Sequence, residues 1–372
     1  MTNQSHHFES LTWLRGLAAF LVIISHTLRA TEQTYNSGDQ VVDWLVLRIF
    51  DLGTFGVLLF FTLSGTTLFL SYSSHPKPPT VSAFYVKRFF RIWPAFAISL
   101  FIYFGFSYLF RYFYGTPSGQ WVESQFMLAP SLLDFVSYLT LSFNISGNSG
   151  LFNNAYWSLP VEFQYYLLFP IMVLLIPYLK AFSPLMMGVA LYLLYKLDLG
   201  VLEDNRMLML GFTFCGGVLL GYLYKHTKLR FGWVFGTSAF LGLVGIASII
   251  RNEFIQLPPL PVISNIWVML GLISILVVGI AMFSDIRLPK RVTGKLFKYG
   301  EFSYSVYLYH NLFIGLAVLL LVNLNINDAI ARYAVVFFLG GIVSSYVASL
   351  SYRFIELPFM KLGSSIAKRI SA

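Results

Sequence analysis

The sequence contains little charge and a single cysteine. Asp, Glu, Lys and Arg make up only 11% of its 372 residues, against about a quarter in soluble domains. The one cysteine, Cys215, excludes a disulfide within the chain, and its apolar surroundings favour a small buried side chain. Phosphate-binding P-loops, dinucleotide-binding GxGxxG turns, GxSxG serine motifs and metal-spaced His/Cys clusters are also missing. These absences argue against the common soluble nucleotide-dependent, serine-hydrolase and zinc enzymes.

Three further observations limit the class of protein. No internal repeat is evident, which weakens an interpretation as a transporter built from inverted halves. The first apolar run is too long for the core of a signal peptide, so we expect no removable leader. The net charge of +9 is spread over segments at the edges of apolar runs, so we expect no nucleic-acid partner.

Long apolar runs fill most of the chain, with 57% hydrophobic residues and a mean hydropathy of +0.71. The sequence therefore predicts an all-α polytopic membrane protein with about ten transmembrane helices. A single membrane domain over residues 10–352 would be flanked by a short cytoplasmic N-terminus, 1–9, and a cytoplasmic tail, 353–372. The expected spans cover residues 10–29, 50–70, 91–112, 156–178, 182–198, 206–224, 232–250, 262–283, 302–323 and 329–352.

The distribution of Lys and Arg predicts the orientation of these spans. With the N-terminus in the cytoplasm, 17 Lys and Arg residues fall on the cytoplasmic side and 7 on the outer side. Since cytoplasmic loops carry the excess of positive charge, both termini are expected to be cytoplasmic. This orientation puts Arg15 in the inner leaflet and His26 near the outer face.

Three segments depart from the simple pattern of regular spans and short loops. Glycines and Ser64 interrupt the second span, so we expect it to be the least regular helix. The outer loop 113–155 contains a short apolar piece, 131–143, which predicts an interfacial or re-entrant helix. The inner loop 284–301 holds five Lys and Arg residues, and we expect an ordinary positively charged loop there.

The first span carries Arg15 and His26 inside an otherwise apolar run. An ionisable residue within a span is costly and indicates a functional site. The two residues are eleven apart, so about three helical turns and roughly 16 Å separate them on nearly the same face. A neutral imidazole is the usual general base near pH 7, which makes His26 a catalytic candidate. The alternative is a buried structural histidine.

Glu162 is the candidate partner of His26. Pro160 suits the first turn of a helix, so the fourth span should begin near Trp157, with Glu162 just inside its outer end. Ser158 would share a face with Glu162. A carboxylate facing a histidine can fix its tautomer and stabilise the imidazolium. The alternative is a carboxylate favoured by the positive end of the helix dipole.

A basic cluster opens the third span, in which Lys87, Arg88 and Arg91 fall on one side of a helix. Clustered guanidinium groups at one mouth of a bundle suit phosphates, which they bind bidentately. The alternative is a topological role with side chains reaching lipid headgroups. Arg15 favours the functional interpretation, because it lies about a turn inside the same leaflet, where topology requires no charge.

The last two spans also carry polar residues. Ser303, Tyr307 and His310 follow the helical spacing i, i+4, i+7 and predict a polar stripe on the ninth span. Arg353 and Glu356 are three apart and predict an intrahelical ion pair at the cytoplasmic boundary.

Six motifs in order along nearly the whole chain resemble the acyltransferase-3 family of bacterial membrane O-acyltransferases, which modify cell-surface and periplasmic glycans. The first, LRGLAAFLVIISH, is similar to the family's Arg-x10-His pattern. Lys87 stands where an arginine is often found, and Thr66 where a bulky apolar residue is usual. The other five are FGVLLFFTLSG, KRFFRIWP, WSLPVEFQYYLLFP, SYSVYLYH and YRFIELP.

This resemblance implies an enzyme of the bacterial inner membrane with a cytoplasmic acyl-CoA donor, acetyl-CoA being favoured. The acceptor would be a hydroxyl of a surface, lipid-linked or periplasmic glycan. Acyl-CoA would be a co-substrate, with no tightly bound cofactor and no metal. His26 would be catalytic, and Arg15, Arg88, Arg91 and Lys87 would bind the donor. Because the chain ends about twenty residues after the last span, we expect no added hydrolase-like domain.

The resulting hypothesis assigns each candidate a role. His26 would take the proton of the acceptor hydroxyl, with Glu162 orienting it. Trp157 would contact the oxyanion or the acceptor. Tyr307, Ser158 and His310 are alternatives for the group that stabilises the oxyanion. Direct transfer is favoured over an acyl-enzyme, because no serine or cysteine has a base at fixed spacing.

Two other classes of function remain open from the sequence. One is a transporter or flippase of lipids or small solutes, because polar stripes in a helical bundle can also line a pathway. The other is a non-catalytic subunit of a glycan-assembly complex, which would make glycan-assembly machinery a partner.

Overall fold

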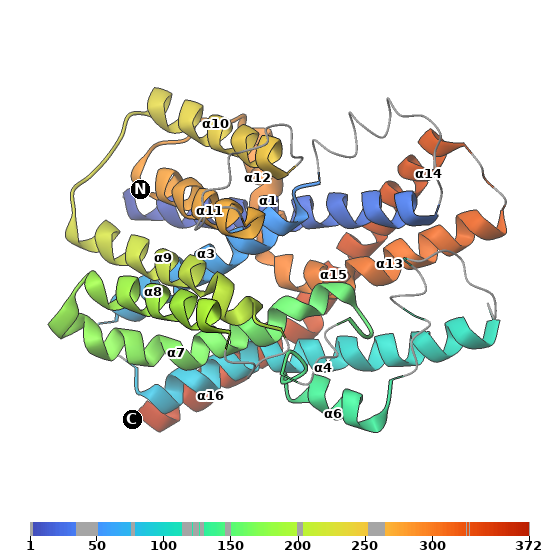
Figure 1. Cartoon of the computed structure of the whole chain (residues 1–372), viewed down its shortest axis with the longest axis horizontal. Helices are drawn as coiled ribbons and strands as arrows, with labels where there is room; N and C mark the ends of the chain where they lie inside the picture. The colour runs from blue at the N-terminus through green and yellow to red at the C-terminus, as the bar shows by residue number, and fades with distance from the viewer. Residues whose placement is uncertain are drawn as a thin grey trace.

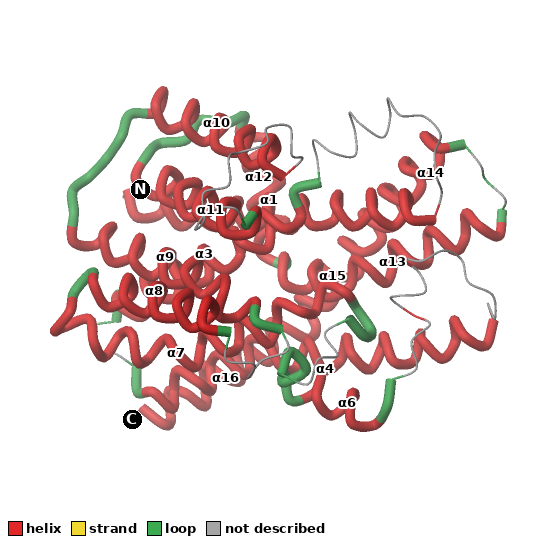
Figure 2. The backbone as a smooth tube through the Cα atoms, in the orientation of Figure 1, coloured by secondary structure: helices red, strands yellow, loops and turns green. Residues whose placement is uncertain are grey.

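The computed structural model describes residues 3–34, 51–75, 79–113, 121, 126, 130–145, 150–198, 204–251, 265–324, 326 and 328–371. Helices form nearly all of this part of the chain, and Figure 2 shows no strand in it. The helices before residue 200 are α1 (Asn3–Thr34), α3 (Gly53–Ser73), α4 (Val81–Phe113), α6 (Leu132–Leu139), η3 (Asn154–Trp157), α7 (Ser158–Leu179) and α8 (Phe182–Leu197). Those after it are α9 (Arg206–His226), α10 (Trp233–Arg251), α11 (Ile266–Phe283), α12 (Lys290–Glu301), α13 (Ser303–Asn323), α14 (Ala329–Val335), η4 (Val336–Val343), α15 (Ser344–Ser351), η5 (Tyr352–Glu356) and α16 (Leu357–Ser371).

The predicted class, an all-α polytopic membrane protein, is confirmed. Nine helices in the described ranges are long and apolar enough to cross a membrane. The remaining predicted span corresponds to α8, an apolar helix of 16 residues. Figure 1 shows the two ends of the described chain at the same end of the bundle, which an even number of crossings would produce.

The last predicted span is longer than expected. A continuous helical run covers 42 residues from Ile330 to Ser371, and two π-helical segments, η4 and η5, lie within it. The segment predicted as a cytoplasmic tail is therefore helical in its described part. Its final helix, α16, lies along α4 (Figure 1), and a Cβ at Gly363 would meet the Phe90 ring.

The first helix, α1, packs against α3, α11, α12 and α13. Its crossing with α12 is close because two glycines face each other's backbone. A Cβ on Gly16 would clash with the carbonyl of Leu296, and one on Gly300 would clash with the carbonyl of Thr12. Small residues allow such close contacts between membrane helices. The expectation of an ordinary loop over 284–301 was therefore wrong, because the segment contains a helix that packs on α1.

The second span, α3, is a continuous helix of 21 residues, so the prediction that it is the least regular was wrong. Of the nine candidate spans in the described chain it is the most buried. Its glycines bring it close to its neighbours rather than bending it. A Cβ at Gly56 would lie 2.7 Å from the carbonyl oxygen of Ala18, and one at Gly65 would clash with the carbonyl of Phe214.

The short apolar piece 131–143 contains the predicted short helix, α6. Ser131 and Asp134 form a capping box at its start. Leu132 and Leu133 are 80% and 76% exposed on the protein, as expected of side chains that enter the membrane interface.

Candidate functional site

A cavity of about 380 Å³ lies beside Arg15, and we call it the Arg15 cavity. It lies between α1, α3, α4, α7 and α13 and reaches Met360 of α16. The polar residues that line it are Thr12, Arg15, Ser64, Thr67, Ser71, Arg88, Arg91, Ser158, Glu162, Tyr166, Ser303, Tyr304 and Tyr307.

Three arginines predicted to act together converge on this cavity. Arg15 donates from Nη2 to Oγ1 of Thr67 at 2.7 Å. Arg88 of α4 also lines the cavity, and its guanidinium is 5.7 Å from the centre of the Tyr166 ring. Within the described chain its Nε is buried without a hydrogen-bond partner. Arg91 completes the set, so cations from α1 and α4 share one site.

Two other predicted cation contacts differ from the structure. Lys87 is half-buried and does not belong to the described lining of the Arg15 cavity. Glu356 pairs with Nη1 of Arg91 at 2.7 Å rather than with Arg353, its predicted partner. The guanidinium of Arg353 instead lies 5.5 Å from the centre of the Phe354 ring. The π-helical turn at residues 352–356 changes the helical register that the sequence prediction assumed.

Glu162 also lines the Arg15 cavity. Its Oε1 accepts hydrogen bonds from the Ser64 hydroxyl at 2.8 Å and the Tyr166 hydroxyl at 2.5 Å. The helix start that places it was predicted correctly, since α7 begins at Ser158 and Pro160 lies in its first turn. His26 and Glu162 nevertheless line different cavities, so the hypothesis that Glu162 orients His26 has no contact to support it.

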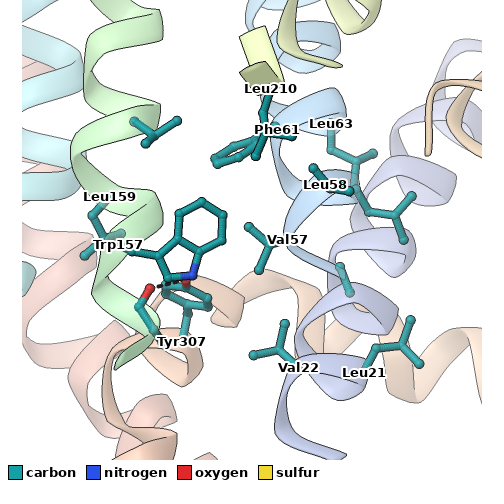
Figure 3. Close-up of a cluster of buried hydrophobic side chains, with 14 of the residues drawn as sticks. Leu21, Val22, Val57, Leu58, Phe61, Leu63, Trp157, Leu159, Leu210 and Tyr307 are labelled. Carbon is teal, nitrogen blue, oxygen red and sulfur yellow. Dashed lines mark hydrogen bonds between the residues drawn. The ribbon is translucent and has the colours of Figure 1, made fainter. Parts of the chain in front are cut away.

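A second cavity of about 270 Å³ lies beside His26, toward the other end of α1, and we call it the His26 cavity. Val57 and Tyr307 line both cavities, which therefore meet at these two side chains. Figure 3 shows Val57 of α3 opposite Trp157 and Tyr307 at this junction. The His26 cavity is lined by Ser25, His26, Arg29, Gly53, Thr54, Val57, Asn154, Trp157, Arg206, Arg251, Ile266, Trp267, Leu270 and Tyr307.

The ring of His26 contacts the ring of His310, on α13. The two ring centroids are 5.0 Å apart, with an interplanar angle of 64°. His310 is fully buried, and its Nδ1 lies 3.1 and 2.9 Å from the carbonyl oxygens of Val306 and Tyr307. In the described chain, Nδ1 of His26 and Nε2 of His310 are both buried without a hydrogen-bond partner.

Tyr307 and Ser158 form a hydroxyl pair at the junction of the two cavities. Their oxygens are 2.6 Å apart, and the Tyr307 hydroxyl also donates to the carbonyl of Ala155. With that proton engaged, the Ser158 hydroxyl must be the donor to Tyr307. The predicted polar stripe of α13 therefore reaches both cavities, since Ser303 lines the first, Tyr307 lines both, and His310 contacts His26.

Sequence analysis missed several residues of both cavities. Ser64 was considered only as an interruption of the second span, and Tyr166 was overlooked although it lies four residues after Glu162 on the same face. The charged residues at the mouth of the His26 cavity had been counted only as charges of outer loops. These charged residues are Arg29, Arg206 and Arg251, and the uncharged Trp267 was also missed.

Fold and site together define a multi-pass helical membrane protein in which two adjacent cavities hold an arginine cluster and a histidine. Residues 8–352 match the family model described as an acyltransferase domain. The chain belongs to this acyltransferase-3 family, as its motifs predicted.

The chain is similar to three named bacterial relatives. It is 27% identical over 345 residues to the peptidoglycan O-acetyltransferase OatA of Listeria monocytogenes, a match covering 84% of this chain and 52% of the relative. It is 24% identical over 350 residues to the O-acetyltransferase OatA of Staphylococcus aureus, covering 84% and 53%. It is 35% identical over 162 residues to the acyltransferase MdmB of Streptomyces mycarofaciens, covering 44% and 38%. The chain thus spans about half the length of the OatA relatives, and no solved structure matches it significantly.

Proposed function

We propose that this chain is an O-acetyltransferase that moves an acetyl group from acetyl-CoA to a hydroxyl of a glycan, in a bacterial inner membrane. The family and the names of the OatA relatives support acyl transfer and a glycan acceptor. The observation that carries the proposal is the meeting of the two cavities at Val57 and Tyr307. A donor held in one cavity would therefore lie next to an acceptor held in the other, with the Val57 and Tyr307 side chains between them.

The Arg15 cavity suits the phosphates of the donor. Three guanidinium groups line it with one carboxylate, Glu162, and the Glu356 carboxylate lies behind Arg91. Within the described lining, positive charge is therefore in excess, and it lies in a site of low dielectric where it binds anions strongly. Arginine is the side chain best suited to hold phosphate through paired hydrogen bonds. The pantetheine arm of acetyl-CoA would extend from there toward Tyr307.

The His26 cavity suits the acceptor. By the Lys and Arg distribution it faces outward, while the Arg15 cavity faces the cytoplasm. A sugar hydroxyl held beside His26 would lie near the junction through which the thioester arrives. The two-sided arrangement would let a cytoplasmic donor modify a glycan on the other side of the membrane.

The transfer would proceed by general base catalysis at His26. His26 would take the proton of the acceptor hydroxyl while the hydroxyl oxygen forms a bond to the thioester carbonyl carbon. Breaking of the carbon–sulfur bond would release the CoA thiolate, which would take up the proton from the imidazolium. The Ser158 and Tyr307 hydroxyls lie beside the expected path of the thioester, with their protons engaged by Tyr307 and by the Ala155 carbonyl. To stabilise the negative charge on the carbonyl oxygen, one of these protons would have to turn from its present acceptor to that oxygen.

His310 is the better positioned residue to orient His26. Its Nδ1 is directed at two backbone carbonyls, so the proton of the neutral ring belongs on Nδ1 and the Nε2 lone pair is free. A proton on Nδ1 of His26 would face that lone pair after a small ring rotation. Nε2 of His26 would then be the basic nitrogen directed to the acceptor.

A transporter remains the alternative in a different class, because two cavities that meet inside a bundle also describe a pathway for a solute. A non-catalytic role beside glycan-assembly machinery is a third. Covalent change of the substrate separates these functions. A transporter moves its substrate unchanged, and a non-catalytic subunit leaves both donor and glycan intact.

The test uses purified full-length protein with labelled acetyl-CoA and bacterial glycan acceptors. We expect label on the glycan, with loss of transfer in His26→Ala. His226→Ala is the matched control, since His226 stacks on Tyr222 at the end of α9, outside the described lining of both cavities. Thermal stabilisation by acetyl-CoA should persist in both variants. Full transfer by folded His26→Ala would contradict the catalytic role of His26.

A further inference from the structure

The part of the His26 cavity beyond His26 combines arginine and tryptophan side chains. Arg29 of α1, Arg206 of α9 and Arg251 of α10 contribute the cations. Trp157 and Trp267 contribute the aromatic rings. We call these five residues the arginine–tryptophan subsite. A general base needs none of them, so their presence calls for a different explanation.

The charges of this subsite do not cancel among the described residues. The Asp51 carboxylate accepts a hydrogen bond from Arg29 at 3.2 Å and another from Arg251 at 2.9 Å, and it also accepts the hydroxyl proton of Ser25. Two guanidinium groups thus share one carboxylate and leave one positive charge in excess. The arginine side chains are 34% and 27% exposed, and Nε of Arg251 is buried without a hydrogen-bond partner among the described residues.

The tryptophans lie beside a third arginine. Arg206 is held by Asp204, to which its Nε donates at 2.7 Å, and its guanidinium lies 4.2 Å from the centre of the Trp157 ring. The Trp157 and Trp267 rings are 5.6 Å apart and nearly perpendicular, at 76°. Together they offer apolar aromatic surface with an indole N–H at its edge. A sugar ring, with apolar C–H groups on its faces and hydroxyls at its rim, matches such a surface.

We propose that the arginine–tryptophan subsite binds an acceptor sugar carrying an anionic group, a carboxylate or a phosphate, near the hydroxyl that becomes acylated. This rests on the proposed function, because it specifies the acceptor of that reaction. The tryptophans would contact the sugar ring, and Arg29 and Arg251 would bind the anion through charge-assisted hydrogen bonds. The cavity of about 270 Å³ is small among ligand sites, which suits one sugar unit at a time.

A purely structural role at Asp51 would need only one of the two arginines Arg29 and Arg251. One guanidinium would suffice to neutralise Asp51 and to tie α1 or α10 to the start of α3. A second guanidinium on the same carboxylate costs desolvation that the shared ion pair only partly offsets. An anionic ligand would supply a second negative charge, which would pair with the guanidinium that Asp51 leaves in excess.

The experiment compares acceptors that differ only in the anion. Detergent-purified full-length protein is titrated with a uronic-acid oligosaccharide and with its methyl ester, and the dissociation constants are read from tryptophan fluorescence. A second pair, a sugar phosphate and the free sugar, tests phosphate against carboxylate. We expect at least one anion to bind about tenfold tighter than its neutral counterpart, with a preference that falls as salt is raised. The proposal would be overturned if the unmodified protein bound the acid as tightly as its methyl ester and the sugar phosphate as tightly as the free sugar.

Arg251→Gln tests which residues carry the preference. It removes one cation while Arg29 still pairs with Asp51, and the preference should fall about tenfold. Arg251→Lys keeps the charge but loses the planar guanidinium, so its preference for the anion should lie between that of the unmodified protein and that of Arg251→Gln. Arg287→Gln is the matched control, because Arg287 also pairs with an aspartate, Asp285 at 3.1 Å, and lies over a tryptophan. A folded Arg251→Gln that keeps the full preference would contradict the assignment of the anion site.

Transfer assays with the same acceptors separate this proposal from the proposed function. If acidic and neutral sugars are acetylated with equal KM and bound with equal affinity, the acetyltransferase function is supported and the anion subsite is contradicted. Selective binding of the acidic sugar without any transfer would support the subsite and contradict the acetyltransferase.

Discussion

The imidazole rings of His26 and His310 lie edge to face with their centroids 5.0 Å apart, although 284 positions separate them in the chain. Each ring carries one buried nitrogen with no hydrogen-bond partner among the described residues. The sequence had offered Glu162 as the group that orients His26, whereas the structure places Glu162 with Ser64 and Tyr166. From this arrangement we propose that His310, rather than Glu162, positions a general base at His26.

We predict that His310→Phe lowers kcat about 10- to 100-fold, because the ring shape remains while the lone pair that would hold the His26 proton is lost. The KM for acetyl-CoA should stay unchanged, since His310 does not line the Arg15 cavity as described. His310→Gln, whose amide oxygen can accept a hydrogen bond, should recover part of the loss and shift the pH profile of kcat. A KM effect without a kcat effect in these steady-state assays would contradict the positioning role.

Arg88→Gln should raise the KM for acetyl-CoA about tenfold or more, because a phosphate would lose a charge-assisted contact. The adjacent Lys87→Gln removes the same charge from a residue outside the described lining of the Arg15 cavity. It should therefore change the KM much less. Equal effects of the two substitutions on donor titrations would indicate a general effect of surface charge rather than a phosphate contact.

Gly16→Ala should lower the stability of the protein by about 1–3 kcal/mol, because the new methyl group would overlap the carbonyl of Leu296 where α1 crosses α12. Gly294→Ala serves as its control. A Cβ at Gly294 meets nothing within 4 Å, and alanine favours helix, so this variant should be neutral or slightly stabilising. Thermal unfolding in detergent measures both, and a Gly16→Ala protein as stable as the parent would show that the crossing can shift without cost.

Asn311→Leu should lower the free energy of unfolding by about 1–3 kcal/mol. The Asn311 amide donates to Oδ1 of Asn153 at 2.8 Å, and Asn153 also donates to the carbonyl of Leu308, so the buried pair holds the start of η3, which leads into α7, against α13. Asn323→Leu changes an exposed amide on the same helix and should have little effect. Comparing the free energies of unfolding of the two variants tests whether the buried pair matters.

The sequence predicted correctly those groupings of residues that follow from depth in the membrane and from helical spacing. Arg15, Arg88 and Arg91 were expected at one level because charge in the inner leaflet is costly without a partner or a ligand, and they share a cavity. The stripe Ser303, Tyr307 and His310 followed from helical spacing alone. Both predictions use only the rise and the period of a helix.

The contacts that the sequence did not reveal depend on rotation about each helix axis. Glu162 lies near the expected end of α7 but on the side of the Arg15 cavity, a choice that depth does not determine. Arg206 and Arg251 were counted as loop charges because their neighbours across the bundle come from distant segments. Helix α12 went unrecognised because its positive charge had a sufficient topological explanation.

The most direct test places donor and acceptor on opposite sides of a membrane. Proteoliposomes containing the full-length protein would enclose a glycan acceptor, with labelled acetyl-CoA added only outside. We predict label on the enclosed glycan from molecules whose Arg15 cavity faces outward, and none with His26→Ala even though that variant still binds acetyl-CoA. Labelling only when donor and acceptor share one compartment, or undiminished labelling by His26→Ala, would contradict transfer between the two cavities.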